Sequence, residues 1–359
     1  MLKNTFIDFA EGKRPLIDTQ LQLIFKQQRA AARSQNAPYY DLVKQLSVLV
    51  ARGGKRLRPL LCLLAYESYG GRRKLPIMRV AASQELLHAF LLIHDDIIDR
   101  DYHRWGGHNI LGVYFDRYSR TMMPRDALHA AEAQALLAGD TCAAMANQVL
   151  MASGFEPQLL MRTQQIQQQT IITEIGGEVA DTAYPYSATM PTEAQVLQMY
   201  CDKTASYSLA LPLRLGALLA GADNTELDQL TRFANDHGVA FQLQDDLLGM
   251  FGDERKTGKP TIGDLREGKR TVLVTKTLEL ASPTVCKQFL KLLGNDAVDE
   301  SSLKRAQTIM IDTGAREYVE QLAYEYSERS LQHLVKTTMN GIGKRRLIDL
   351  MALLANRDH

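Results

Sequence analysis

Residues 81–101 read AASQELLHAFLLIHDDIIDRD, and this stretch decides the fold. Drawn as a helix, it has apolar residues on nearly every side, which is typical of a helix buried in the middle of a bundle. Yet it also carries Glu85, two histidines and then four aspartates. Buried charges cost several kcal/mol unless they are paired or bind a metal. This conflict between burial and charge indicates a functional site.

The rest of the chain also reads as helical. Long stretches lack proline, and apolar residues recur in them at helical spacing, as at Phe289, Leu292 and Leu293. Strict alternation of Val, Ile and Thr is scarce, so strands have little support. We therefore predict an all-α protein in which residues 1–359 form one helical domain. Turn signals separate the expected helices at four places: Gly70–Gly71, Gly106–Gly107, 221–224 and Gly341.

Composition excludes several functional classes. The 42 basic residues nearly balance the 41 acidic ones, so no overall field favours nucleic acid or an anionic membrane. The four cysteines form no C-x-x-C pair, which fits a reducing compartment. No stretch approaches the ~20 apolar residues that a transmembrane segment needs. We expect a soluble, cytoplasmic protein that binds no nucleic acid.

The first candidate motif is D-D-x-x-D, formed by Asp95, Asp96 and Asp99. The i, i+4 spacing places Asp95 and Asp99 on one helix face, one turn apart. Two ionised carboxylates this close repel each other, and a divalent cation between them removes the repulsion. Hard oxygen ligands suit Mg²⁺ that also binds a ligand's phosphates. The alternative is a solvated acidic helix end.

Two further clusters strengthen the metal interpretation. A second acidic pair, Asp245–Asp246, lies in the helix-patterned segment 241–249 and is followed by lysines. Four basic residues lie between positions 52 and 58 around two glycines, which reads as an anion site at a helix start or as a solvated basic loop. Lys203 and Thr204 place another cation beside a hydroxyl. Together these features predict a cavity with two acidic walls that binds two diphosphates and one apolar tail.

In this combination of motifs the chain resembles the trans-isoprenyl diphosphate synthases, the polyprenyl synthetase family. The matches run in the family's order from about residue 50 to 275, and residues 135–140 (ALLAGD) resemble a further family segment. The resemblance implies one domain of largely antiparallel helices around a deep central cavity, in a homodimer. It also implies a substrate pair, isopentenyl diphosphate and a C5–C15 allylic diphosphate.

The resemblance also assigns roles to single residues. It implies that isopentenyl diphosphate binds to three basic side chains: Lys55, Arg58 and His88. It implies three Mg²⁺ ions on the allylic diphosphate, held by aspartates of both motifs: Asp95, Asp99 and Asp245, with Asp96 and Asp246 in support. Four cations would contact the allylic diphosphate directly: Arg104, Lys203, Lys259 and Lys269. Thr204 and Gln242 would lie beside the reacting carbons, whereas His94 reads as a core histidine.

The implied reaction is stepwise. Metal ions and lysines stabilise the departing diphosphate, because fixed cations in a closed site stabilise developing negative charge. The isopentenyl double bond then attacks the allylic carbocation, and a proton is lost, in our interpretation to the diphosphate itself. No protein nucleophile is required, and the sequence offers no Ser-His or Cys-His arrangement that demands one.

The chain departs from the family pattern at three places. Trp105 follows Arg104 where the family has a second arginine, which normally helps to hold isopentenyl diphosphate. Gly249 ends the second acidic motif where an aspartate is usual; we expect activity to survive, because metal binding there rests mostly on the motif's first aspartate. Glu178 stands where glutamine is common, and Asp181 beside it is a weak candidate for the site.

The resemblance to the family implies that steric limits on the growing tail set the length of the product. The tail is expected to grow beside the helix that carries the first motif, where Phe90 lies about 7.5 Å below Asp95. One aromatic at this position with the aliphatic Leu91 as its neighbour resembles the synthases that stop at C20, geranylgeranyl diphosphate. A C15 product is the second choice, and small residues would have indicated a longer one. Phe90 is equally readable as a packed core aromatic.

Two rival functions remain. A terpene cyclase also ionises an allylic diphosphate, but typically carries an Asn-Ser/Thr-Glu motif in place of a second aspartate pair and needs no second diphosphate site. A non-catalytic partner subunit of a prenyl synthase tends to lose one acidic motif, and this chain keeps both pairs. The sequence does not determine the preferred primer, the pathway or whether a dimer is homomeric.

Overall fold

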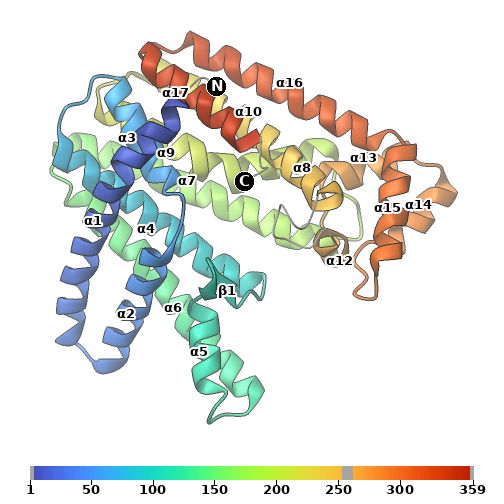
Figure 1. Ribbon diagram of the computed structural model, residues 1–359, viewed down its shortest axis with the longest axis horizontal. Helices are drawn as coiled ribbons and strands as arrows, with labels where there is room; N and C mark the ends of the chain where they lie inside the picture. Colours follow the sequence, from blue (N-terminus) through green and yellow to red (C-terminus); the bar gives the residue numbers. More distant parts are fainter. Residues whose placement is uncertain (1–3, 253–261, 356–359) are drawn as a thin grey trace. The chain divides into compact units, whose positions relative to one another are not determined.

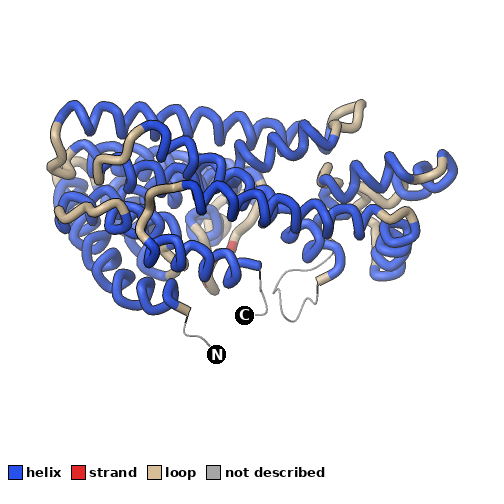
Figure 2. Tube along the Cα trace, turned by 90° about the horizontal axis from the view of Figure 1, so that it is seen from above, coloured by secondary structure: helices blue, strands red, loops and turns tan. Residues whose placement is uncertain are grey.

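The computed structural model describes residues 4–252 and 262–355 (Figure 1). Nearly all of the chain so described is helical, and Figure 2 shows a single short strand region in red among the blue helices. The prediction of an all-α fold is confirmed. The chain forms two compact units: the N-terminal unit, residues 7–165 and 215–221, and the C-terminal unit, residues 1–6, 166–214 and 222–359.

The N-terminal unit consists mainly of the first six α-helices and a two-stranded hairpin. Helix α4 is its buried element: every residue from 80 to 87 is buried, and the helix packs along α3 and α6. The prediction of a central helix with apolar residues on most sides is confirmed. The elements are α1 (Thr5–Arg33), α2 (Ala37–Arg52), α3 (Leu57–Ser68), α4 (Lys74–Ile98), β1 (His103–Arg104), β2 (Gly107–His108), α5 (Ile110–Tyr118) and α6 (Pro124–Met151).

The boundary between the units falls within α7 (Pro157–Ala183) and α9 (Leu211–Leu219). In the C-terminal unit α10 packs along α16, as Figure 1 shows, and against the π-helical segment η2. The other elements are η1 (Tyr184–Tyr186), α8 (Glu193–Tyr200), η2 (Cys201–Ala210), α10 (Asn224–Phe251), α12 (Gly263–Glu267), α13 (Val272–Leu280), α14 (Pro283–Leu290), α15 (Glu300–Asp312), α16 (Ala315–Lys336) and α17 (Gly341–Ala355).

The turn signals fall where helices end, with one exception. Gly70–Gly71 separates α3 from α4, and Asp223 caps α10 by accepting a hydrogen bond from the Glu226 N–H at 3.0 Å. Gly106–Gly107 lies in the β1–β2 hairpin instead, where the sequence predicted a turn between helices. A single domain with a shared central cavity stays a prediction.

Candidate active site

The first acidic motif lies at the carboxyl end of α4. Asp95 and Asp96 belong to its last turn, and Asp99 is the capping residue, whose N–H donates to the Asp95 carbonyl at 2.8 Å. Arg100 then adopts a left-handed conformation, φ +57°, and the helix does not continue. Asp95 is half-buried and Asp99 is exposed. The backbone hydrogen bond from Asp99 to Asp95 places the two residues one helical turn apart, as the sequence predicted.

Asp96 is the buried member of this motif and binds Arg104. Its carboxylate is 1% exposed. It accepts hydrogen bonds from Arg104 Nε at 2.8 Å and from Arg104 Nη2. Burial raises the pKa of Asp96, and the Arg104 guanidinium opposes that shift. The family resemblance assigned Arg104 to the allylic diphosphate; in the structure its side chain binds Asp96, and contact with a diphosphate stays a prediction.

The aspartates fit the chemistry of a magnesium site without forming a preassembled one. Within residues 4–252 and 262–355, no three His, Cys, Asp or Glu side chains gather into a metal-binding group. Asp96 Oδ2 is nevertheless buried, with no hydrogen-bond partner among the described residues. A buried carboxylate oxygen of this kind suits a hard cation or an ordered water. Carboxylates and the oxygens of a bound diphosphate would together complete such a site.

The basic loop between α2 and α3 separates its four cations into two classes. Arg56 is 5% exposed and donates to Glu85 Oε1 and Asp18 Oδ1, both at 2.8 Å. Arg52 Nη1 donates to the His108 carbonyl at 2.7 Å. Lys55 is exposed and Arg58 half-buried. From the sequence, all four cations read as an anion site or a solvated basic loop. In the structure Arg52 and Arg56 instead bind carbonyl and carboxylate groups within the fold. The sequence could not reveal these acceptors, because they come together only in the tertiary structure.

Glu85 is a charged residue buried in α4, and Arg56 neutralises its charge. It is 3% exposed in the middle of the helix and accepts a hydrogen bond from Arg56 Nη1. Burial raises the pKa of Glu85, and Arg56 offsets only part of that shift. Removing either partner would leave a buried charge without its counter-charge. Glu85 is therefore part of the support of the basic loop.

The histidines of α4 lie in different surroundings. His88 is half-buried, and burial lowers its pKa well below the usual value, with Arg58 and Arg104 acting in the same direction. His88 is therefore neutral at pH 7 and can offer an anion an N–H but not a charge. His94 Nε2 lies 3.2 Å from the Leu136 carbonyl and 3.8 Å from Asp140 Oδ1; its side chain is half-buried, and its reading as a core histidine stays a prediction.

The two residues predicted to limit chain length lie one helical turn before the first motif. Phe90 is half-buried, and its ring packs edge-on against His94, with centroids 4.8 Å apart. Leu91 is 7% exposed and belongs to the core. Both positions are in the N-terminal unit. The packing of Phe90 agrees with the core interpretation and leaves its proposed role as a floor a prediction.

The second acidic motif lies on α10 in the C-terminal unit. Asp246 is buried, and burial raises its pKa well above the usual value. Its Oδ2 accepts a hydrogen bond from the Tyr200 hydroxyl, which itself accepts from the Val272 N–H at 3.1 Å. Asp245, the other member, is half-buried. The two aspartates therefore differ, with Asp246 held inside the unit and Asp245 nearer its surface.

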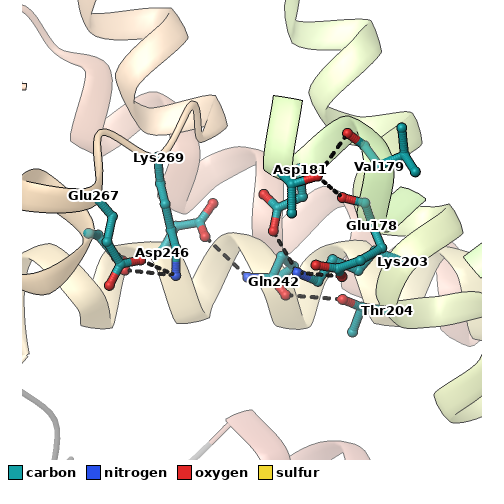
Figure 3. A network of polar contacts seen from close by, with 11 residues as sticks. Glu178, Val179, Asp181, Lys203, Thr204, Gln242, Asp246, Glu267 and Lys269 are labelled. Atoms are coloured by element: carbon teal, nitrogen blue, oxygen red, sulfur yellow. Dashed lines mark hydrogen bonds and ion pairs between the residues drawn. The ribbon is translucent and has the colours of Figure 1, made fainter. Parts of the chain in front are cut away.

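A row of polar side chains leads from this motif to η2, as Figure 3 shows. Gln242 donates from Nε2 to Asp246 Oδ1 at 3.2 Å, and its Oε1 accepts from the Thr204 hydroxyl at 3.4 Å. Thr204 and Gln242, predicted to lie beside the reacting carbons, are thus neighbours in space. Their oxygen dipoles are oriented by hydrogen bonds to each other and to Asp246.

Lys203 lies between two carboxylates of α7 (Figure 3). Its ammonium is 2.6 Å from Asp181 Oδ2 and 2.8 Å from Glu178 Oε2. Burial alone would lower the pKa of Lys203, but these two carboxylates outweigh it and raise the pKa. Lys203 is carried by a π-helical segment, a form of backbone that is rare and frequent at functional sites. Asp181, the weak candidate, is therefore a direct partner of a predicted site lysine.

Asp264 is a carboxylate beside the second acidic motif that the sequence analysis did not single out. A Cβ atom built on Gly249 would lie less than 3.0 Å from Asp264 Oδ2, so this carboxylate fills the space beside the glycine that replaces the motif's last aspartate. Lys269 Nζ lies 3.4 Å from Asp264 Oδ1. It also lies 3.1 Å from Glu267 Oε2, as Figure 3 shows. The sequence feature that could have found Asp264 is that it follows the second acidic motif in the chain, as Lys269 does. Lys259 lies outside the described residues.

Similarity to known proteins agrees with this geometry. Residues 41–310, three quarters of the chain, match the family described as polyprenyl synthetase. The chain belongs to the polyprenyl synthetase family. The family resemblance inferred from the motifs is confirmed, and the matched residues contain both acidic motifs, the basic loop and Lys203.

Curated members of the polyprenyl synthetase family are similar over most of their length. A geranylgeranyl diphosphate synthase of Sulfolobus acidocaldarius is 34% identical over 80% of this chain and 81% of its own. A geranylfarnesyl diphosphate synthase of Aeropyrum pernix is 34% identical over 84% of this chain and 90% of its own. The chain is a trans-prenyltransferase, as the sequence predicted.

A solved structure extends the similarity to the whole fold. The geranylgeranyl pyrophosphate synthase of Corynebacterium glutamicum, complexed with isoprenyl diphosphate and magnesium, is 31% identical. The match covers 99% of this chain and all of that one, with a TM-score of 0.87. No helix among the described residues of this polyprenyl synthetase combines the length and the hydrophobicity needed to cross a membrane.

Proposed function

We propose that this polyprenyl synthetase condenses isopentenyl diphosphate with an allylic diphosphate, depends on Mg²⁺ and releases a C20 product. The observation that carries the proposal is the pair of acidic motifs on α4 and α10. Arg104 binds Asp96 of the first motif, and Gln242 connects Asp246 of the second motif to Thr204, the neighbour of Lys203. A related geranylgeranyl pyrophosphate synthase crystallised with isoprenyl diphosphate and magnesium supports the ligand set.

In the N-terminal unit, we assign isopentenyl diphosphate to Lys55, Arg58 and His88. Lys55 is exposed in a loop whose neighbour Arg56 is anchored in the core, so the loop can present a charge without moving. His88 is neutral and would donate an N–H to a phosphate oxygen. Positive charge on a fixed loop binds a diphosphate with little loss of conformational freedom.

Metal binding is assigned to both acidic motifs. Asp95 and Asp99 of the N-terminal unit and Asp245 of the C-terminal unit would be ligands, with Asp96 and Asp246 in support. When bound, Mg²⁺ supplies positive charge that stabilises the departing diphosphate. Asp96 and Asp246 are held by Arg104 and Tyr200 respectively, so their backbone neighbours are kept in place. The predicted number of three ions remains part of the proposal.

In the C-terminal unit, we assign the ionisation step to Lys203 and the two polar groups beside it. Lys203 keeps its charge at any physiological pH, because Asp181 and Glu178 raise its pKa. Its ammonium would hold the leaving diphosphate together with Lys269 and Lys259. The oxygens of Thr204 and Gln242, oriented by their mutual hydrogen bond, would stabilise the allylic cation. No residue of the chain is required as a nucleophile.

The C20 length is supported by Phe90 and by the relatives. Phe90 lies on α4 before the first motif, and the geranylgeranyl diphosphate synthase of Sulfolobus acidocaldarius is among the similar proteins. A C25 product is the second candidate, because the Aeropyrum pernix geranylfarnesyl diphosphate synthase is equally identical. The C15 product considered from the sequence would be indicated by two aromatics before the first motif, and this chain has Phe90 followed by the aliphatic Leu91.

Product analysis tests this proposal. Purified protein is incubated with Mg²⁺, labelled isopentenyl diphosphate and, in separate reactions, the C5, C10 and C15 allylic diphosphates. Label in a linear C20 diphosphate is expected; a C15 or C25 product would keep the reaction and discard the length. Absence of incorporation from every primer, in folded protein with Mg²⁺, would favour a non-catalytic partner subunit, and cyclic hydrocarbon products a terpene cyclase. Sedimentation of the same sample tests the homodimer that the family resemblance implies.

A further inference from the structure

The turn between β1 and β2 has an unusual residue at its first central position. His103 pairs with His108 and Arg104 with Gly107, which leaves Trp105 and Gly106 as a two-residue turn. Both have positive φ, +51° at Trp105 and +74° at Gly106. Turns of this kind favour Asn, Asp or Gly at that position, because a bulky side chain is strained there. Such strain persists only where the surroundings hold the residue in place.

The surroundings of Trp105 are the two glycines of the basic loop. A Cβ atom on Gly53 would lie 2.8 Å from Trp105 Cγ and 3.0 Å from its Cβ, and one on Gly54 would lie 3.5 Å from Cζ2. The indole therefore packs directly on the backbone that precedes Lys55. Only glycine at position 53 permits this contact, since any larger residue would meet the indole.

The hairpin that carries Trp105 is fixed at both of its strands. Arg52 Nη1 donates to the carbonyls of His108 at 2.7 Å and of Arg104 at 3.4 Å. The Arg104 side chain donates to Asp96 of the first acidic motif. The hairpin thus connects the basic loop to that motif, and Trp105 lies between the two connections.

The basic loop is also anchored from its other side. Arg56, with φ +54°, donates from Nη1 to the Gly53 carbonyl at 2.6 Å and from Nη2 to the Val50 carbonyl at 2.6 Å. Gly54 has φ +104°. Gly54 and Arg56 thus both have positive φ, and contacts with other residues are needed to hold the loop in this conformation. The Arg56 guanidinium and the Trp105 indole supply that support at neighbouring residues.

We propose that Trp105 is the positioning residue for the isopentenyl diphosphate site, holding Gly53 and Gly54 so that Lys55 and Arg58 are presented to the diphosphate. Where the family pattern has an arginine that would itself contact the anion, this chain has an aromatic platform under the loop that binds it. The inference rests on the proposed function. It predicts that affinity for isopentenyl diphosphate depends on the indole ring and not on a charge at position 105.

Trp105 is the only tryptophan of the chain, so its fluorescence reports on the loop directly. Isopentenyl diphosphate, added without Mg²⁺ or primer so that no turnover occurs, is expected to change the emission saturably. Inorganic pyrophosphate is expected to produce the same change with weaker affinity, since it shares the anionic group. Lys55→Ala, which keeps the indole, should abolish the response at the same concentrations. Calorimetric binding with unchanged emission would overturn the proposal.

Kinetic measurements distinguish two roles for position 105: an indole ring that supports the basic loop, and a position that merely lacks the family's arginine charge. Trp105→Ala is expected to raise the KM for isopentenyl diphosphate about tenfold, while the KM for the allylic substrate stays within about twofold. Trp105→Phe should recover most of the affinity, because a ring remains on the glycines. Trp105→Arg should behave like the alanine variant. Tyr186→Ala, which removes an aromatic that is 91% exposed, is the matched control and should leave both constants unchanged.

Three results would contradict the proposal. An unchanged isopentenyl KM in Trp105→Ala, or an arginine variant that binds more tightly than the parent, would show that the indole does not position the loop. An equal rise of both KM values would indicate a general structural effect. If Trp105→Ala does not fold, the phenylalanine variant and the emission of the parent protein decide. These failures leave product formation by the parent intact, whereas failure of the proposed function abolishes it.

Discussion

Gly249 and Asp264 share one small space in the C-terminal unit, with the aspartate carboxylate where a side chain at position 249 would begin. We expect Gly249→Ala to displace Asp264 without unfolding the protein, because the end of an acidic side chain can move. Activity should fall about 10- to 100-fold, the range for residues next to a metal site, because Asp264 lies beside the second acidic motif and Lys269. Steady-state rates as a function of Mg²⁺ concentration measure this effect.

A double-mutant cycle provides the control for the Gly249 variant. Asp264→Ala should lower activity as much as Gly249→Ala, and combining the two should add nothing, because both remove the same carboxylate from the same place. Additive losses would mean that the alanine at 249 acts through another contact. The thermal midpoints of all three variants should stay close to that of the parent.

Gly177 and its neighbour Gly176 offer a matched pair on α7. A Cβ atom at Gly177 would lie less than 3.0 Å from the Lys203 backbone nitrogen, whereas Gly176 faces open space. Gly177→Ala should therefore destabilise the protein by about 1–3 kcal/mol and displace the segment that carries Lys203 and Thr204. Gly176→Ala should be neutral or stabilise the protein by up to ~1 kcal/mol.

Denaturant unfolding and kcat, measured on the two glycine variants, test this expectation. The prediction is that only Gly177→Ala loses stability and turnover together. Equal stability of both variants would show that α7 and η2 can separate without cost. Loss of stability with an unchanged kcat would show that the position of Lys203 is not limiting.

The sequence was sufficient for the class of fold and for the family, because both depend on local patterns and motif order, whereas the roles of single site residues stay predictions. Burial of α4 and the acidic pairs on helices follow from helical spacing, whereas Thr204 and Gln242 were singled out only by the family resemblance and are found hydrogen-bonded to each other. The supports of those residues did not follow, since they are backbone carbonyls and distant side chains. Arg56 shows the difference: its sequence context indicated an anion site, and its position in the fold made it an internal counter-charge for Glu85.

The departures from the family pattern are where structure added most. Gly249 looked like the loss of a carboxylate, and the structure places Asp264 in the vacated space. Glu178 was known only as a departure from the usual glutamine, and in the structure it is an ion-pair partner of Lys203. Neither relation can be read from spacing, because each depends on a contact between different helices.

Glu178 has a consequence for binding of the allylic diphosphate. Lys203 is held by two carboxylates, and a diphosphate must compete with them for the ammonium. Glu178→Gln should weaken that competition and lower the allylic KM about three- to tenfold, equivalent to roughly 1 kcal/mol. Initial rates at varied allylic diphosphate measure it, with the exposed Glu156→Gln as the control. A higher KM in Glu178→Gln would mean that Glu178 orients Lys203 for binding.

His237 should make the protein sensitive to acid. It is 6% exposed, neither ring nitrogen has a hydrogen-bond partner among the described residues, and burial lowers its pKa to about 4. The unfolded chain therefore takes up a proton first as the pH falls below about 6.5, and stability is lost toward the folded-state value. Between pH 7 and pH 5 this loss amounts to about 2 kcal/mol.

Unfolding measured at both pH values tests the assignment to His237. His237→Leu should lose about 2 kcal/mol less than the parent between pH 7 and pH 5, because it has no imidazole to protonate. His129→Leu, which removes an exposed imidazole, is the control and should follow the parent. If His237→Leu and the parent lose the same stability on acidification, the sensitivity resides elsewhere.

Substitution of Phe90 tests whether its ring limits the growing tail or only packs in the core. Its ring packs against His94 at 4.8 Å, so Phe90→Ala should cost stability, about 3 kcal/mol if the cavity stays empty. If Phe90 also limits the growing tail, the same variant should extend the product from C20 to C25 and beyond. Phe90→Leu, which keeps most of the volume, should give mainly C20. Chromatography of the dephosphorylated products beside an unfolding curve separates the two roles. Lost stability with an unchanged product distribution would leave Phe90 a core residue and move the search for the floor to other residues along the tail.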